Sequence, residues 1–424
     1  MIAPFYVPAL DDDFRASVYG AFGATPSETA ELVNYARCPF NVDALRARVS
    51  YPLPDEPFVS TWETYVNESS RIGAAATLRA RLVQLRFPIA RGMSDCEPYR
   101  AATRRGEWPS GESDGLPLRR PEGLVIMIAP TAAGRIATIV SDDRADFESL
   151  VRALTRRNEP EPIPRSIGAC MVAGYNNWDR IAALRAAWAA GREGGDDVDA
   201  WRAEFAALVP QRDRYQDRFI VLSTGPYSGV RAAAVGMGEA EWLAASLVIR
   251  REHECAHYFT RRAFGSMRNT LVDETIADYM GIVAAAGRFR ADWMLEFLGV
   301  ARDGSCRADG RLHHYRGTPP LSDGAFTVLR AVVVRAADAL EDFDAGLASG
   351  ATPRPLALHA STITTLARVG LEGLAATDAG RLLRDASAAT EEDCFDGRTD
   401  DDTALGRSGG RRPQALGPRQ RALG

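Results

Sequence analysis

The chain changes character near residue 225, and this change limits the folds that it can adopt. Apolar runs of strand length occur before that point, in "GLVIMIAP" (123–130), "RIATIV" (135–140) and "DRFIVLSTG" (217–225). From Gly238 to the mid 380s, the spacing of apolar residues is almost wholly helical. Strands that precede helices along the chain favour a segregated α+β fold over an alternating α/β fold. We therefore expect a small sheet followed by a mostly helical half.

The predicted helices divide the chain further. In the second half they span 239–259, 271–286 and 325–347, and earlier ones span 62–85, 144–157 and 178–190. Residues 104–123 are rich in Gly, Pro and Ser, which is typical of a linker or a long loop. We expect a mixed helical and irregular region at 1–115, one main domain at 116–388, and a polar, Gly-rich tail at 389–424 that is disordered.

Charge and cysteine usage argue against several classes of function. The net charge of −5 over 424 residues gives no electrostatic reason to expect nucleic acid or an anionic membrane as a partner. No stretch of the sequence approaches the roughly 18 to 20 apolar residues that span a bilayer. The N-terminus lacks the basic start and apolar core of a signal peptide. The six cysteines form no CxxC pair, so we expect reduced thiols and a cytoplasmic protein.

The motif with the most chemical content is "HECAH", residues 253–257. On a helix, residues i and i+4 lie on one face, about 5 to 6 Å apart at Cβ, so His253 and His257 can present two imidazole nitrogens to one metal ion. Glu254 lies about 100° further round the helix, where it can reach a water bound to that ion. The alternative is an ordinary helix with two hydrogen-bonded histidines. Because the chain has only five histidines, a chance HExxH is rare, which favours the metal site.

A third ligand is expected downstream, on another element. Glu274 and Asp278, in "VDETIADYMG" (272–281), are again four positions apart, on a helix that Thr270 and Asp273 could open as a capping box. One carboxylate can bind the metal, and the other can accept the free N–H of a ligating histidine. A solvated acidic face is the alternative. The apolar residues beside these carboxylates leave little polar surface for it, which favours the metal site.

HECAH followed by DETIAD resembles the HExxH…ExxxD signature of the gluzincins, the thermolysin-like clan of zinc metallopeptidases. The resemblance covers about residues 218–285 and implies a zincin-like catalytic domain that binds Zn²⁺. It implies that His253, His257 and Glu274 are the zinc ligands. It also implies that Glu254 is the general base and that Asp278 is the hydrogen-bond partner of the first histidine. Three charged residues precede the motif, Arg250, Arg251 and Glu252, whereas zinc peptidases usually have an uncharged residue two positions before the first histidine, where this chain has Arg251.

Two further elements are expected in such an enzyme. An edge strand before the active-site helix would hold a peptide by adding it to the sheet, and residues 218–225 lie where that strand is expected. An ordinary core strand is the alternative. A donor to the developing oxyanion is also needed. The segment "GRLHHYRG" (310–317) makes His313, His314 and Tyr315 candidates for this donor, and a surface loop without a role is the alternative.

These observations lead to one main hypothesis and two alternatives. The main one is a zinc metallopeptidase that hydrolyses an amide bond of a peptide with metal-activated water, in which Glu254 is the general base and passes the proton to the leaving amine. The first alternative is a zincin-fold binding or scaffold protein, whose structural or vestigial zinc site would have a closed fourth position. The second is zinc-dependent hydrolysis of a non-peptide substrate.

Overall fold

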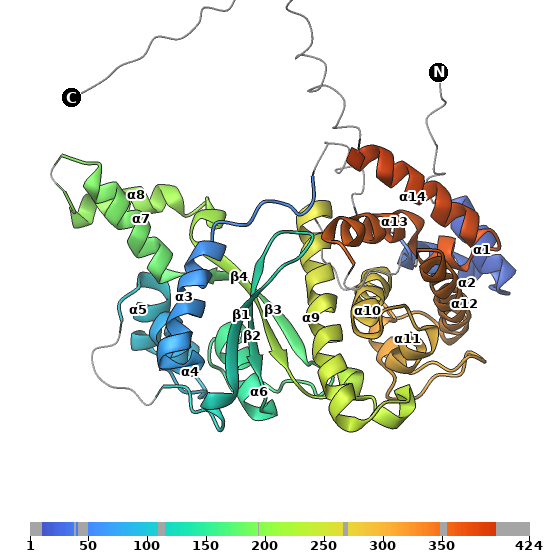
Figure 1. The fold of residues 1–424 in the computed structure, drawn as a ribbon, viewed down its shortest axis with the longest axis horizontal. Helices are drawn as coiled ribbons and strands as arrows, with labels where there is room; N and C mark the ends of the chain where they lie inside the picture. Colours follow the sequence, from blue (N-terminus) through green and yellow to red (C-terminus); the bar gives the residue numbers. More distant parts are fainter. Residues whose placement is uncertain are drawn as a thin grey trace, which may run out of the picture.

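The protein has an α+β fold in which a four-stranded sheet lies between two groups of helices (Figure 1). The computed structural model describes residues 11–37, 40, 50–108, 115–193, 195–265, 270–347 and 354–395. Of the tail predicted to be disordered, residues 389–395 form the end of the last helix, and the rest lies outside the described residues. The coarse prediction of a small sheet followed by a mostly helical half is confirmed.

The helices and strands follow one another in the order that the sequence patterns indicate for most of the chain. The strands are β1 (Leu124–Ala129), β2 (Ile136–Ser141), β3 (Ala169–Asn176) and β4 (Gln216–Ser223). The helices before α9 are α1 (Asp12–Ala21), α2 (Pro26–Tyr35), α3 (Val59–Ile72), α4 (Ala74–Arg81), α5 (Glu97–Arg105), α6 (Arg144–Thr155), α7 (Trp178–Ala190) and α8 (Val198–Leu208). The later ones are α9 (Glu239–Phe264), α10 (Leu271–Ala286), α11 (Ala291–Leu298), α12 (Asp323–Leu347), α13 (Leu356–Ala375) and α14 (Ala379–Phe395).

The sheet separates two hydrophobic cores. Its order is β1-β2-β4-β3, with β2 and β4 parallel and the two outer pairs antiparallel. Successive residues of β4 point to opposite faces, so Phe219 and Val221 pack with α3, α4 and α6, whereas Ile220 and Leu222 pack with the helical half. Both faces of β4 are therefore buried, which explains its nearly continuous apolar sequence.

The edges of the sheet are β1 and β3, not the strand predicted from the sequence. Residues 218–225 were expected to supply an edge strand, but β4 pairs with β2 on one side and with β3 on the other. The alternative, an ordinary core strand, is therefore correct. β3 was not predicted as a strand because Gly174 and the polar residues after it interrupt its apolar pattern, and its pairing with β4 shifts register between Ala173 and Tyr175.

The region before residue 115 contributes to both cores. The predicted helix 62–85 is broken at Gly73, which has φ 85° and ψ 154°, so that α3 and α4 are separate helices beside β1. A positive φ of this kind is readily adopted only by glycine. By contrast, α1 and α2 pack against α12 and α13 at the other end of the molecule (Figure 1). The residues expected to form an N-terminal region are thus divided between the two halves.

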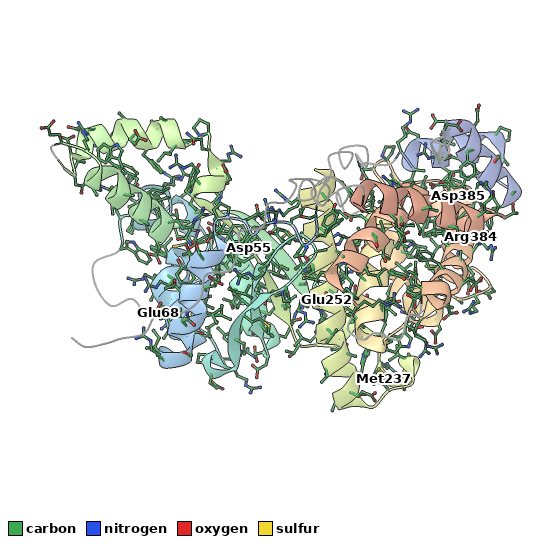
Figure 2. All side chains as sticks on the ribbon, turned by 45° about the horizontal axis from the view of Figure 1, so that its top comes forward. Asp55, Glu68, Met237, Glu252, Arg384 and Asp385 are labelled. Atoms are coloured by element: carbon green, nitrogen blue, oxygen red, sulfur yellow. The ribbon has the colours of Figure 1, made fainter. Side chains whose placement is uncertain are left out.

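Helix α9 lies between the halves and pairs closely with α10. It contacts β3 and β4 as well as α10 and α13, and the side chain of Glu252 marks its middle in Figure 2. A Cβ atom at Gly281 of α10 would lie 2.7 Å from the carbonyl oxygen of Ile249 on α9, so only glycine permits this approach. The predicted helices 239–259 and 271–286 are confirmed, and their close packing sets the geometry described next. No helix among the described residues is long and apolar enough to span a bilayer.

Candidate metal centre

The two histidines of HECAH and one downstream carboxylate meet at a buried point between α9 and α10. His253 Nε2 lies 3.1 Å from His257 Nε2, and the two oxygens of Glu274 lie 3.6 Å and 3.5 Å from these nitrogens. All three potential ligand atoms lie within 4.8 Å of one another. The residues are 7%, 3% and 6% exposed, respectively. The structure therefore brings together the three predicted zinc ligands.

The other nitrogen of His253 is held by a carboxylate and a phenol. His253 Nδ1 lies 3.0 Å from Asp278 Oδ1 and 2.9 Å from the hydroxyl of Tyr227, which itself donates to Asp278 over 2.6 Å. A carboxylate beside Nδ1 favours a proton on that nitrogen, which leaves a lone pair on Nε2. Asp278 thus occupies the place expected of the partner of the first histidine.

The second histidine also faces a buried carboxylate. His257 Nδ1 lies 3.2 Å from Asp273 Oδ1, without the alignment of a good hydrogen bond, and Asp273 is fully buried. Asp273 was expected to form a capping box with Thr270. That expectation is wrong, because Thr270 caps α10 without a side-chain hydrogen bond and Asp273 points inward to the histidine. Burial opposes a charge on the imidazole, but Asp273 and Glu274 together raise the pKa of His257 above its ordinary value.

The donor set fits a tetrahedral zinc ion. With Nδ1 of each ring facing a carboxylate, the Nε2 atoms of His253 and His257 both face the carboxylate of Glu274, and in the Nδ1-protonated tautomer each would offer a lone pair to a metal ion. Burial alone would raise the pKa of Glu274, but the hydrogen bond and charge of His257 and the charge of His253 hold it well below its ordinary range. Zinc bound at about 2.0 to 2.2 Å to three such atoms in a tetrahedron separates them by roughly 3.3 to 3.6 Å. The two nitrogens lie 3.1 Å apart, and each lies 3.5 or 3.6 Å from a different oxygen of Glu274, so the donors surround a space of about this size.

The loop at 310–317 reaches this centre through Arg311 and Tyr315. Arg311 pairs with Asp278 and donates to the hydroxyl of Tyr227 over 3.1 Å. The hydroxyl of Tyr315 donates to Glu274 Oε2 over 2.8 Å. Of the three predicted oxyanion donors, Tyr315 alone therefore touches a predicted ligand.

The two histidines of that loop have other surroundings. His313 Nε2 lies 3.1 Å from the carbonyl oxygen of Arg307 and 3.6 Å from the sulfur of Cys306. His314 is exposed and lines a separate cavity. Within the described residues, neither forms a hydrogen bond or an ion pair with the three ligands, so the structure does not bring them into the centre.

Glu254 lies beside the ligands without a partner of its own. It is half-buried, and among the described residues it forms no hydrogen bond or ion pair. Burial raises its pKa, although the charges of His257 and His253 oppose this. Burial and the nearby charge of Glu254 also raise the pKa of the Cys170 thiol to about 12. Because Cys170 belongs to β3, the carboxylate of Glu254 lies on the side of the centre that faces the edge strand.

Arg250, one of the charged residues that precede the motif, is a structural clamp. Its guanidinium is buried and donates to the carbonyl oxygens of Ser223, Gly225 and Pro226 over 2.8 to 2.9 Å. This burial lowers the pKa of Arg250 to about 10. The clamped segment leads directly to Tyr227, which it places against His253. Arg250 thus has a structural role, because its guanidinium fixes the loop that follows β4.

Sequence reasoning missed Tyr227, Arg311, Asp273 as a histidine partner, and Arg250 as a clamp. Of these, Arg250 alone lies in a stretch that the sequence had marked as unusual, the charged residues 250–252 before HECAH. Tyr227 and Arg311 lie outside any recognisable spacing, and contacts across 51 and 33 positions join them to Asp278. Such contacts depend on the complete fold.

Comparisons with known proteins give one match. The profile of a family of unknown function, DUF7005, matches residues 17–378, which include every residue of the centre described above. No curated protein and no solved structure matches the chain.

Proposed function

We propose that this chain, which belongs to the DUF7005 family, is a zinc-dependent hydrolase that cleaves an amide bond, with a peptide as its substrate. One observation carries the proposal. The Nε2 atoms of two histidines and a carboxylate converge in a buried space, the other nitrogen of each ring faces a second carboxylate, and among the described residues Glu254 forms no hydrogen bond or ion pair beside them. A buried set of acceptors is stable only when a cation or a proton joins them.

Each residue of the centre has a distinct part in this proposal. His253, His257 and Glu274 would hold the zinc ion, while Asp278 and Asp273 keep the Nδ1 protons in place and direct the Nε2 lone pairs inward. When bound, zinc lowers the pKa of a water molecule and polarises a carbonyl group. Glu254 accepts a proton from that water at its carboxylate and later gives it to the leaving amine.

The edge strand β3 is the proposed place of the substrate. Among the described strands, β1 and β3 each pair on one side only, and β3 is the one that contacts α9, so its other edge could add an extended peptide by backbone hydrogen bonds. Glu254 is close enough to Cys170 on β3 for its charge to act on the thiol. A peptide on this edge would therefore lie beside the general base. The sequence analysis had assigned this peptide-binding role to residues 218–225.

Tyr315 is the remaining candidate for the oxyanion donor. Its hydroxyl is already at the centre, where it donates to Glu274. In the proposed reaction this hydroxyl turns from the ligand carboxylate to the developing oxyanion. We assign no step to His313 and His314, because their contacts lie elsewhere.

The proposal is tested by the variant Glu254→Gln. Glutamine keeps the size of the side chain and can still hydrogen-bond a water molecule, but it is not a base. We expect unchanged zinc stoichiometry and a fall in the hydrolysis of a peptide library by roughly 10² to 10⁴-fold. Glu252→Gln, two positions earlier on α9, is the matched control and should hydrolyse like the wild type. Equal hydrolysis by the wild type and the Glu254→Gln variant would sink the proposed role.

One observation favours the second candidate, a scaffold with a structural zinc site. The three ligands are only 3% to 7% exposed, and structural zinc sites are closed whereas catalytic ones keep an open position. Cobalt-substituted protein distinguishes the two, because a small hydroxamate can bind only an open position and then changes the visible spectrum of the cobalt. An unchanged spectrum would favour the scaffold. Binding of hydroxamate without cleavage of any peptide would favour the hydrolysis of a non-peptide substrate.

A further inference from the structure

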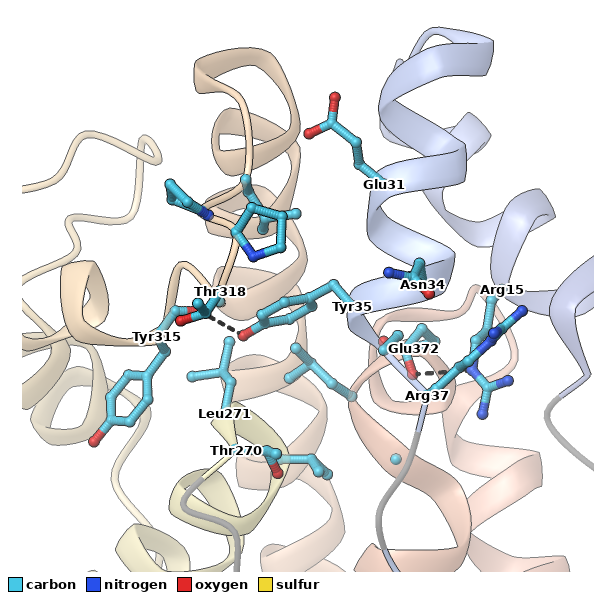
Figure 3. Close-up of a pocket in the computed structure, with 18 of the residues that line it drawn as sticks. Arg15, Glu31, Asn34, Tyr35, Arg37, Thr270, Leu271, Tyr315, Thr318 and Glu372 are labelled. Carbon is cyan, nitrogen blue, oxygen red and sulfur yellow. Dashed lines mark hydrogen bonds and ion pairs between the residues drawn. The ribbon is translucent and has the colours of Figure 1, made fainter.

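A second site for a small molecule lies beyond the metal centre, in a cavity of about 750 Å³. Its walls are α1, α2, the start of α10, the segment after Tyr315 and the later part of α13 (Figure 3). Pockets that bind small organic ligands have volumes of about 300 to 1,000 Å³. The hydroxyl of Tyr315 reaches Glu274 while the rest of this residue lines the cavity, so Tyr315 stands between the cavity and the metal centre.

Two arginines lie at one end of the cavity. Among the described residues, Arg15 and Arg37 both pair with Asp12, at 3.2 Å and 3.4 Å, and Arg15 Nε lies 4.0 Å from Glu372 Oε2. Arg15 is buried, and within the same part of the chain its Nε has no hydrogen-bond partner. Figure 3 shows both guanidinium groups beside Glu372 on the same side of the cavity. A buried N–H group without a partner can donate to a ligand anion.

Glu372 lies at the same end of the cavity. Its Oε1 accepts a hydrogen bond of 2.5 Å from Tyr19, and its Oε2 lies 4.0 Å from Arg15 Nε. Burial raises the pKa of Glu372, although the hydrogen bond from Tyr19 and the charge of Arg15 oppose the shift. Guanidinium donors that face one space are suited to a ligand carboxylate.

The remainder of the cavity is largely apolar. Leu271 and Val272 from α10 line it, together with Leu321 and Leu371. Leu371 reaches the cavity because α13 is broken at Gly370, whose φ of 62° and ψ of 177° interrupt the helix. The cavity therefore joins a cationic end to an apolar body.

We propose that this cavity binds a small amphipathic carboxylate, with its head group between Arg15 and Arg37 and its chain over Leu271, Leu321 and Leu371. The charge distribution and the volume of the cavity support this ligand class over a neutral or cationic one. The proposal goes beyond the hydrolase activity and needs no metal ion, since none of these groups belongs to the metal centre.

Titration calorimetry on the full chain tests the proposal, in zinc-loaded and in chelator-treated protein. The probes are butanoate, hexanoate and octanoate, with octanamide as the uncharged counterpart. We expect octanoate to bind in both states, with an affinity that rises about fourfold per methylene group. Octanamide should bind at least tenfold more weakly, because charged hydrogen bonds contribute more than neutral ones.

Two variants locate the head group. Arg15→Gln and Arg37→Gln should each weaken octanoate about tenfold or more, and Arg37 is exposed enough for its variant to fold normally. Arg384→Gln on α14 (labelled in Figure 2) removes an exposed arginine outside the cavity and should change nothing. Equal binding of octanoate and octanamide, equal loss in the Arg37 and Arg384 variants, or no binding of any probe would each overturn the proposal.

Discussion

Two buried polar clusters lie on opposite faces of the sheet, and they differ in whether they are complete. Around Asp217, Oδ2 accepts hydrogen bonds from Trp62 Nε1 and Asn177 Nδ2 over 2.9 and 2.6 Å, and Oδ1 accepts one from Arg180 over 2.8 Å. Every oxygen of this carboxylate has donors from the chain itself. The cluster joins α3, α7 and β4 and has no need of a ligand.

The cluster between α9 and α10 lacks such closure. Its outer groups, Asp278, Tyr227 and Arg311, are paired with one another. At its centre, however, the Nε2 atoms of His253 and His257 face each other and Glu274. The comparison teaches that burial and hydrogen bonding alone do not mark a functional site. The two clusters differ in that the second brings together three groups, His253, His257 and Glu274, that could hold a metal ion.

The largest expected effect concerns the complete cluster. Asp217→Ala leaves the buried Arg180 without its partner and should lower the free energy of unfolding by about 3 to 5 kcal/mol. Urea denaturation followed by circular dichroism measures this loss. Zinc stoichiometry of the folded variant should equal that of the wild type. A loss below about 1 kcal/mol, within the range of exposed ion pairs, would mean that the cluster is not structural.

The next effect is the change in stability when a chelator removes zinc from the incomplete cluster. Zinc at 100 times its dissociation constant should stabilise the wild type by about 2.7 kcal/mol over chelator-treated protein. The variant His257→Ala should lose this response, whereas Asp217→Ala should keep it. Thermal unfolding with and without zinc measures the difference. If His257→Ala responded to zinc like the wild type, the ion would bind elsewhere.

A smaller effect separates the ligands from the groups that orient them. Asp278→Asn keeps the shape of the side chain but weakens its hold on the Nδ1 proton of His253, so zinc affinity should fall about 10 to 100-fold. Competition with a coloured chelator gives the affinity. Asp344→Asn is the control, because Asp344 is another buried carboxylate, paired with Tyr279 and Arg354. Equal zinc affinities of the two variants would contradict the orienting role of Asp278.

The smallest expected effect concerns Glu372 in the cavity, and the pH dependence of stability tests whether its partners compensate for its charge. Burial raises its pKa above the ordinary 4.5, while Tyr19 and Arg15 from α1 oppose the shift, and Tyr35 from α2 also faces it. A raised folded-state pKa gives stability that is full below pH 4.5 and is lost as the pH rises through the folded value. The wild type should therefore lose stability relative to Glu372→Gln between about pH 4 and pH 8. If the free energies of unfolding of the two proteins changed with pH in parallel, the partners of Glu372 would compensate for its ionisation.

The sequence predicted what depends on spacing along one element. The helices 239–259 and 271–286 follow from apolar periodicity, and the shared face of His253 and His257 follows from the i, i+4 rule, whereas Glu274 was chosen as the third ligand from the resemblance to a known motif. The partner of the first histidine, Asp278, was placed from the resemblance to a known motif. These predictions required no knowledge of which element packs against which.

What the sequence could not give depends on distant contacts and on sheet order. β3 was missed because a register shift and a glycine disrupt its apolar pattern. β4 was wrongly placed at the edge because the sequence of a single strand does not determine its position in the sheet. Tyr227 and Arg311 enter the centre through loops whose positions are set by the Arg250 clamp and by helix packing. The direction of His313 and His314 away from the centre likewise depends on the neighbours of their loop.

The hydrogen bond between Tyr19 and Glu372 joins residues 353 positions apart, and this separation has a consequence for protein synthesis. A ribosome adds roughly 5 to 20 residues per second, so α1 leaves it about 20 to 70 seconds before the part of α13 that covers it. During that interval α1 and α2 can contact each other but lack their partners on α12 and α13. The sheet can form earlier, because all its strands precede α9. The helical half, and with it the cavity beside Arg15, can be completed only near the end of translation.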